Sequence, residues 1–290
     1  ESFDLVGSLS GSSNMPWPLS NDQERRRLER AFTNRNIPFD TPGFYDHPNF
    51  LTHEQKDPRF LELYARYIET RQYGDDYLAN AAAKIDIAAN ALVSAVKADG
   101  RLGACVDASG MLGRMLDRLG IWNYVAKATL TITFPSGSGI TDRYFWSFDE
   151  GSFAAPHAIV VAPPFGVVDV TVRHQIYEGS EGDYLPPLVM ARDWLPAKWT
   201  PEDLANPEIR AALKLQGMSF DTFLQRQNSS MGDVMRTLPP RQVKLGDTIL
   251  KYVVVAVGGT IEPLEEITGY KPSNRTALQI FEQDIFPKIK

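Results

Sequence analysis

The chain has 290 residues, of which 43% are hydrophobic and 23% charged, and it carries a formal net charge of −6 with a pI near 5.3. A chain of this length and composition folds as an ordinary globular protein, with one large domain or two smaller ones and no need for disulfides or metals. The acidic balance argues against a nucleic-acid-binding surface, and the apolar runs are shorter than a membrane span. We therefore expect a soluble protein that is either cytoplasmic or exported after removal of a signal. The sequence does not determine its oligomeric state.

The first third of the sequence predicts an arm followed by helices. Residues 1–20 are rich in Gly, Ser and Pro, which predicts an extended arm that contributes nothing to the core. Apolar residues at helical spacing predict helices over 20–36 and 57–73, and Gly74 ends the second. Residues 1–74 form the predicted N-terminal extension.

An alanine-rich pattern over 75–98 predicts a long helix that ends at Gly100. A second helical pattern starts shortly after Gly103 and continues to Gly120, and it begins with Cys105, the single cysteine of the chain. Free backbone N–H groups and the helix dipole at a helix N-terminus favour a thiolate over a thiol. Cys105 is therefore a candidate nucleophile, although a lone cysteine is more commonly a small buried apolar residue.

Downstream of Gly120 the hydrophobic period changes from helical to alternating. Strands are predicted over 125–134 and 143–148, and residues 156–162 and 167–172 predict a hairpin. His157 opens the first hairpin strand, and Asp169 lies in the second, where an unpaired carboxylate is costly to bury. The two polar side chains on adjacent strands call for a common explanation.

The last third, residues 176–290, is predicted as a C-terminal helical and β extension packed on the core. Its patterns predict helices over 201–215 and 219–227, a strand from 243 or 248 to 257, and a closing helix over 274–285.

Cys105, His157 and Asp169 together supply what cysteine catalysis of acyl transfer needs. The sulfur attacks a carbonyl carbon, the imidazole moves the proton, and the carboxylate holds the imidazole in its tautomer. The backbone N–H of Cys105 would meet the oxyanion, together with a second donor that the sequence does not identify.

These residues carry a resemblance to a known family. Gly103-Ala-Cys105 at the start of the helix, His157-Ala158 on one strand and Asp169-Val-Thr171 on the next resemble the core of the transglutaminase-like superfamily. The resemblance covers residues 75–175 and implies an α+β, papain-like core in which the cysteine helix packs on an antiparallel sheet. It implies a Cys105, His157 and Asp169 triad that acts on a peptide, protein or small amide as peptidase, amidase or transglutaminase. The tryptophan common after the His-Ala pair is Ile159 here.

Other interpretations stay open at this stage. Arg101-Leu-Gly-Ala-Cys-Val-Asp107 is a loose version of the signature of arylamine N-acetyltransferases, which implies acetyl transfer as the alternative activity. A binding module that keeps the triad without chemistry is a third interpretation, and His174 is a second candidate base. One cysteine and scattered histidines have no metal-ligand spacing, so we expect neither a metal nor a cofactor.

Overall fold

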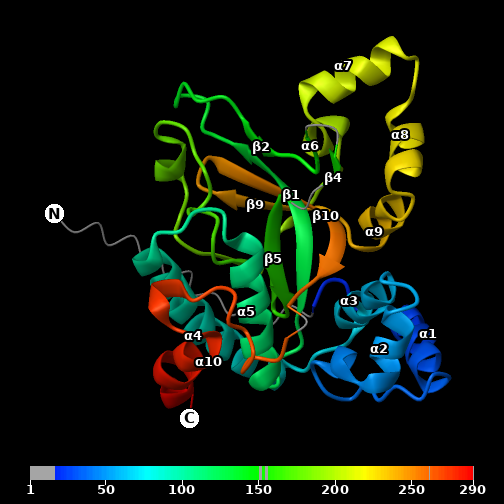
Figure 1. Ribbon diagram of the computed structural model, residues 1–290, viewed down its shortest axis with the longest axis vertical. Coiled ribbons are helices and arrows are strands. Elements are labelled where there is room, and N and C mark those ends of the chain that lie inside the picture. Colours follow the sequence, from blue (N-terminus) through cyan, green and yellow to red (C-terminus); the bar gives the residue numbers. More distant parts are fainter. Residues whose placement is uncertain (1–16, 150–151, 154–155, 261, 290) are drawn as a thin grey trace.

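The computed structural model describes residues 17–149, 152–153, 156–260 and 262–289. A curled antiparallel sheet stands between two groups of helices, so the chain is an α+β protein, as the sequence predicts (Figure 1). Within these described ranges, no helix combines the length and apolar character required to cross a bilayer.

The α-helices lie in four stretches of the chain. They are α1 (Asp22–Thr33), α2 (Pro48–Glu54), α3 (Phe60–Thr70), α4 (Asp75–Asp99), α5 (Cys105–Arg118), α6 (Pro201–Leu204), α7 (Pro207–Leu215), α8 (Phe220–Gln227), α9 (Met231–Thr237) and α10 (Ala277–Ile280). Short 3-10 turns are η1 (Phe44–Asp46), η2 (Glu181–Tyr184), η3 (Pro272–Asn274) and η5 (Phe286–Lys288), and a π-helical turn, η4 (Phe281–Ile285), continues α10.

The strands form one large sheet and one small hairpin. They are β1 (Tyr124–Thr133), β2 (Arg143–Phe145), β3 (Phe148–Asp149), β4 (Ser152–Phe153), β5 (His157–Ala162), β6 (Phe165–Asp169), β7 (Val189–Ala191), β8 (Leu195–Pro196), β9 (Arg241–Leu245) and β10 (Thr248–Gly258). The large sheet has the order β7-β6-β5-β1-β10-β9-β8, with β2 paired to β1, and all its pairs are antiparallel. β3 and β4 pair with each other in a small hairpin, and Phe148 of β3 also forms an isolated parallel bridge with Ala205.

Strand β1 is the centre of the sheet. It pairs with β5 along Tyr124–Ala128 on one side and with β10 from Val125 to Thr133 on the other. Because β10 comes from the last fifth of the chain, the sheet joins the predicted core to the predicted C-terminal extension. The boundary predicted at residue 175 stays a prediction, but backbone hydrogen bonds of one sheet cross it.

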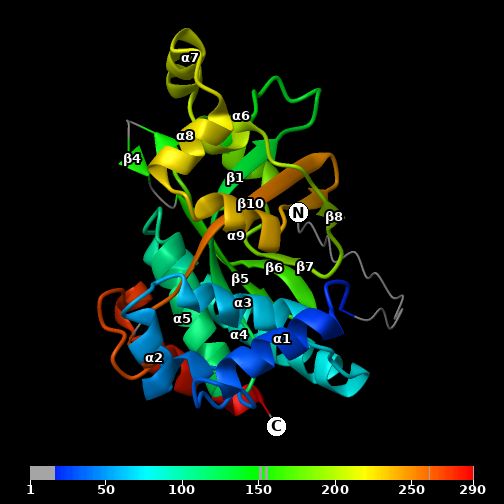
Figure 2. The same cartoon turned by 90° about the vertical axis from the view of Figure 1, so that its right-hand side faces the viewer.

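Helices cover both faces of the sheet with separate apolar clusters. Helices α1–α3 and the even-numbered residues of β1 bury one cluster, which is rich in aromatic rings, and α4, α5 and α10 bury a second cluster on the opposite face. Figure 2 shows α1–α3 in front of the sheet with α4 and α5 behind it. A third, smaller cluster joins α6–α9 to Phe148 and β10.

One residue of the predicted N-terminal arm, Trp17, is buried in the core. Residues 1–16 lie outside the described residues, but Trp17 is only 3% exposed and its Nε1 donates to the Glu69 carbonyl at 2.7 Å. Its ring also lies 5.3 Å from that of Trp194. The expectation that residues 1–20 contribute nothing to the core is therefore wrong at Trp17, because a large aromatic side chain with a bonded N–H is favourable to bury.

Two predicted elements are shorter than the sequence indicates. The helix predicted over 201–215 is divided into α6 and α7, because Asn206 precedes Pro207 and is held extended as the N-cap of a new helix. The second hairpin strand ends at Asp169, whose carboxylate accepts the Thr171 N–H at 3.0 Å and so turns the chain.

Candidate active site

Cys105 is the first residue of α5, and two glycines place it there. Gly100 ends α4 in the left-handed conformation at φ 75°, and Gly103, at φ 72°, donates its N–H to the His174 carbonyl at 2.9 Å. The N-cap residue, Ala104, has no side chain that can bond the first turn of the helix. The backbone N–H groups that open α5 therefore remain available to a substrate oxygen.

His157 and Asp169 come together through the β5–β6 hairpin. Val160 pairs with Val168, and both valine side chains lie on the α5 face of the sheet. The odd-numbered residues His157 and Asp169 therefore lie on the opposite face. His157 Nε2 lies 2.6 Å from Asp169 Oδ2, and both side chains are fully buried. The structure thus brings together the predicted base and its predicted partner.

Three further hydrogen bonds fix the Asp169 carboxylate. Thr171 donates to Oδ1 from its backbone N–H at 3.0 Å and from its hydroxyl at 3.4 Å. The Tyr252 hydroxyl on β10 donates to Oδ2 at 3.1 Å. Both carboxylate oxygens are therefore engaged, which holds the orientation of the group that orients His157.

Sequence reasoning assigned no role to these two supporting residues. Thr171 had a local signal, since an Asp followed two residues later by a small polar residue is typical of a side-chain-bonded turn. Tyr252 had none, because it is separated from Asp169 by 83 residues and only the pairing of β10 with β1 brings it near.

The second ring nitrogen of His157 is the unpaired atom of the site. Among the described residues Nδ1 has no hydrogen-bond partner, although it is buried. The Cys105 side chain is close enough to raise the pKa of this ring, and its Sγ lies 3.8 Å from the carbonyl of Pro156, the residue before His157. Because Asp169 occupies Nε2, Nδ1 is the nitrogen left for the sulfur.

The charge state of His157 follows from its neighbours. Burial by itself lowers the pKa of the imidazole, but the Asp169 carboxylate, and after it Cys105, outweigh burial and raise the pKa to about 10. The ring therefore carries two protons at neutral pH, one facing each partner.

The triad is closed to solvent in this structure. Cys105 is 3% exposed, and His157 and Asp169 are 0% exposed. The rings of Tyr252 and Phe145 lie 6.1 and 6.3 Å from the imidazole and help to exclude water from it. Electrostatic interactions between the three residues are stronger in such a dry environment than in water.

The other candidate base, His174, is placed differently. Its carbonyl accepts the Gly103 N–H, but Asp169 bonds to His157 instead. Burial, and then the charges of Arg173 and Lys97, lower the pKa of His174. The described part of the chain also contains no group of three or more His, Cys, Asp or Glu side chains that could hold a metal ion.

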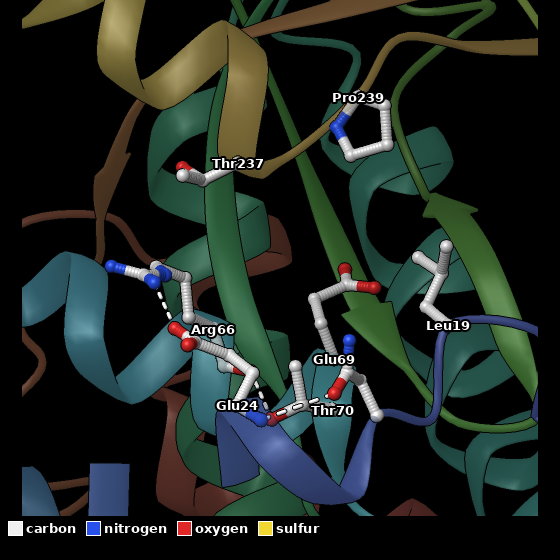
Figure 3. Close-up of a pocket in the computed structure, with 8 residues that line it drawn as sticks. Leu19, Glu24, Arg66, Glu69, Thr70, Thr237 and Pro239 are labelled. Atoms are coloured by element: carbon white, nitrogen blue, oxygen red, sulfur yellow. Dashed lines mark hydrogen bonds and ion pairs between the residues drawn. The ribbon is translucent and has the colours of Figure 1, made fainter. Parts of the chain in front are cut away.

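Hollows on the described surface lie apart from the triad. Figure 3 shows one of about 240 Å³ between α1, α3 and residues 237–239, where Glu24 and Arg66 form an ion pair and the carboxylate of Glu69 lies to the right of them. A second, of about 230 Å³, lies between α2, α3, α5 and the ends of β1 and β10. Neither is lined by Cys105, His157 or Asp169.

Comparison of the chain with protein-family models, with curated proteins and with solved structures gives no match. The function of the site must therefore be argued from its chemistry.

Proposed function

We propose that the chain is a cysteine-dependent acyl-transfer enzyme that acts on an amide bond through a thioester on Cys105. The observation that carries the proposal is the position of the His157 ring, whose Nε2 is 2.6 Å from Asp169 while its buried Nδ1 is left for the sulfur. The Asp169 carboxylate and the Cys105 side chain both act on this one buried imidazole, which is the set of groups that nucleophilic catalysis by a cysteine needs.

The reaction follows from these positions. The Cys105 thiolate adds to the amide carbon, the carbonyl π electrons move to oxygen, and the oxyanion accepts hydrogen bonds from the open N–H groups of α5. The tetrahedral intermediate then collapses: the C=O re-forms, the C–N bond breaks, and His157 Nδ1 gives its proton to the leaving nitrogen. The products are a thioester and a free amine or ammonia.

The second half returns the enzyme to its starting state. Neutral His157 takes a proton from water or from an incoming amine, which attacks the thioester carbon and expels the Cys105 thiolate. Capture by water makes the protein a peptidase or amidase, and capture by an amine makes it a transglutaminase. We favour hydrolysis, because water is always available and no amine site is needed.

The same proposal includes a transglutaminase-like, papain-like core. The features that support it are a cysteine at the N-terminus of a helix packed on an antiparallel sheet, and a histidine and an aspartate on adjacent strands of that sheet. The order Cys, His, Asp along the chain is the order in that superfamily.

The test is a trap for the thioester. The protein is incubated with a library of peptide amides and acyl-glutamine peptides, and intact mass spectrometry reads the mass added to Cys105 with and without hydroxylamine, which cleaves thioesters. We expect a hydroxylamine-sensitive adduct on the wild type and none on Cys105→Ser. Released ammonia, or incorporation of a fluorescent primary amine, then separates hydrolysis from transfer.

A matched pair of histidine variants tests the assignment of the base. His157→Asn is expected to slow adduct formation by on the order of 10²-fold or more, the usual contribution of a positioned acid or base. His174→Asn is the control and should leave the rate within about twofold. The reverse result, or an adduct formed from acetyl-coenzyme A but from no amide, would replace the proposal with His174 chemistry or with acetyl transfer.

A further inference from the structure

The cavity between α2, α3, α5 and the ends of β1 and β10 is lined in part by charged side chains that form no ion pair with any described residue. Its volume is about 230 Å³, and its walls come from three distant parts of the chain. Leu51, Leu61 and Val257 are among the apolar side chains that line it. This space is large enough to hold several water molecules and therefore a small ligand.

Most polar groups of the cavity are already paired. Arg114 holds Asp46 through both ends of its guanidinium group and donates from Nε to the Thr260 carbonyl at 3.1 Å. The Tyr45 hydroxyl donates to Asp117, and the Tyr64 hydroxyl accepts the Gly43 N–H at 3.0 Å. These contacts fix the floor of the cavity, where the Arg114 guanidinium also lies over the Tyr45 ring and the Tyr45 and Tyr64 rings pack edge to face.

Two charged side chains of opposite sign stay unpaired. Glu54, at the end of α2, and Lys127, on β1, both line the cavity, and neither forms an ion pair or hydrogen bond with a described residue. Burial, and then the charge of Asp46, raise the pKa of Glu54, so the folded protein disfavours its anionic form. A positive group next to Glu54 would relieve this cost.

Glycines direct Lys127 into the cavity. A Cβ on Gly258 would come within 2.4 Å of Lys127 Cε and 3.1 Å of Nζ, so the lysine chain lies directly over the Gly258 backbone. Gly258 and Gly259 both line the cavity, and at Gly259 a Cβ would make only ordinary contact with Val125, at 3.7 Å. The ammonium group is therefore held at the β10 side, and Glu54 lies on the α2 side.

We propose that this cavity binds a free amino acid with an apolar side chain. The carboxylate of the ligand pairs with Lys127, its ammonium group pairs with Glu54, and its side chain lies against Leu51, Leu61 and Val257. Charge-assisted hydrogen bonds at both ends and an apolar middle are the features that such a zwitterion requires. This binding site is separate from the triad and does not depend on the proposed chemistry.

The test is calorimetric titration of the full chain with L-leucine and L-phenylalanine at millimolar concentrations. We expect binding of at least one of them. N-acetyl-leucine, which lacks the ammonium group, leucinamide, which lacks the carboxylate, and glycine, which lacks the apolar side chain, should each bind about tenfold more weakly or not at all. Absence of heat with every zwitterion, or equal affinity for the blocked analogues, would overturn the proposal.

Variants locate the binding to this cavity. Lys127→Met and Glu54→Gln should each weaken binding about tenfold, whereas Lys244→Met, an exposed lysine on β9 of the same sheet, should not change it. Gly259→Leu fills the cavity without backbone strain and should abolish binding while the far-ultraviolet circular dichroism stays that of the wild type. Unchanged affinity in Lys127→Met or in the filled variant would place the ligand elsewhere and refute the site.

The Cys105→Ser variant separates this inference from the enzymatic proposal. It should bind the amino acid with wild-type affinity, because no triad residue lines the cavity. Retained binding in Cys105→Ser would leave the amino acid site standing whatever the thioester trap shows, and a thioester on the wild type without amino acid binding would leave the enzyme standing without this site. Loss of binding in Cys105→Ser would show that the ligand occupies the active site and would overturn the separate site.

Discussion

Two of the buried clusters of charged groups differ in which residues surround their unpaired atoms. One is the triad. The other joins Glu69 of α3 to Arg241 of β9, with Tyr124 donating to the same Glu69 oxygen and Arg241 also donating to the Gly166 carbonyl. Both clusters are almost completely excluded from solvent and both contain a carboxylate with a cationic partner.

Each cluster also retains atoms without a partner. In the second cluster these are Glu69 Oε2 and Arg241 Nε, and the residues around them are aromatic, with the Trp194 ring 5.0 Å from the guanidinium. In the triad the unpaired atom is His157 Nδ1, and its neighbour is a cysteine at a helix N-terminus. Burial of charge is therefore common to both, and only the presence of a nucleophile makes one of them a candidate for chemistry.

The largest effect is expected from a substitution at Glu69. Glu69→Gln leaves the Arg241 charge buried without its partner, which we expect to lower the free energy of unfolding by about 3–5 kcal/mol. Urea unfolding measures this loss. Glu24→Gln, which removes the partly exposed ion pairs of Glu24 with Arg66 and Arg27 at the same hollow, is the matched control and should cost no more than about 1 kcal/mol.

Glu69→Gln must also leave the chemistry of Cys105 unchanged, measured below the melting temperature. If it slowed alkylation of Cys105 as much as a triad substitution does, the two clusters would not be functionally distinct.

Asp169→Asn should have the next largest effect. The asparagine keeps the size of the side chain but removes the charge that keeps His157 protonated, so alkylation of Cys105 by iodoacetamide at pH 6 should slow by on the order of 10²-fold. The rate is followed by intact mass and compared with that of a free thiol in the same buffer. A wild-type Cys105 no more reactive than the free thiol at this pH would contradict an activated nucleophile.

The pH dependence of stability distinguishes the clusters in another way. The pKa of His157 is raised from 6.5 to about 10 on folding, so folding retains a proton on this ring. Its contribution to stability is therefore complete below pH 6.5 and is lost as pH rises through 10, by at most about 1.4 kcal/mol per pH unit. Subtracting the urea stability of Asp169→Asn at each pH isolates this contribution, and a difference that stayed constant from pH 6.5 to 9.5 would show that His157 is neutral in the folded protein.

Tyr252→Phe should give the smallest effect. It removes one of the hydrogen bonds to Asp169 while three others remain, so we expect a loss of about 1 kcal/mol in stability and a decrease of a few fold in Cys105 alkylation. The pH at which alkylation is half-maximal should shift as well, because the carboxylate would be less well oriented. Phe145→Leu, which alters the other ring beside His157 without touching Asp169, is the control for packing.

The candidate site was predictable where its signals are local. The helix start at Cys105 follows from Gly100, Gly103 and the apolar period after them, and the hairpin that carries His157 and Asp169 follows from two β-rich runs with a short turn. The bonds of Tyr252 and Glu69 were not predictable, because each joins segments that are far apart in the sequence and depends on the register of β10 or β9. Helices α2 and α9 were missed because each has only seven residues, too few for a clear period.

The pairing of β1 with β10 also constrains how the protein can be made. When residues 124–133 leave the ribosome, the strand that will cover one of their edges has not yet been synthesised, since Val125 pairs with Gly258. Until β10 has been synthesised, β1 exposes a long apolar edge of the kind that pairs with other chains. The nascent chain at this stage already contains Cys105, His157 and Asp169 but not Tyr252, so the complete carboxylate environment forms only near the end of synthesis. The central strand of the sheet and the carboxylate environment of the triad are therefore completed by the same late segment of the chain.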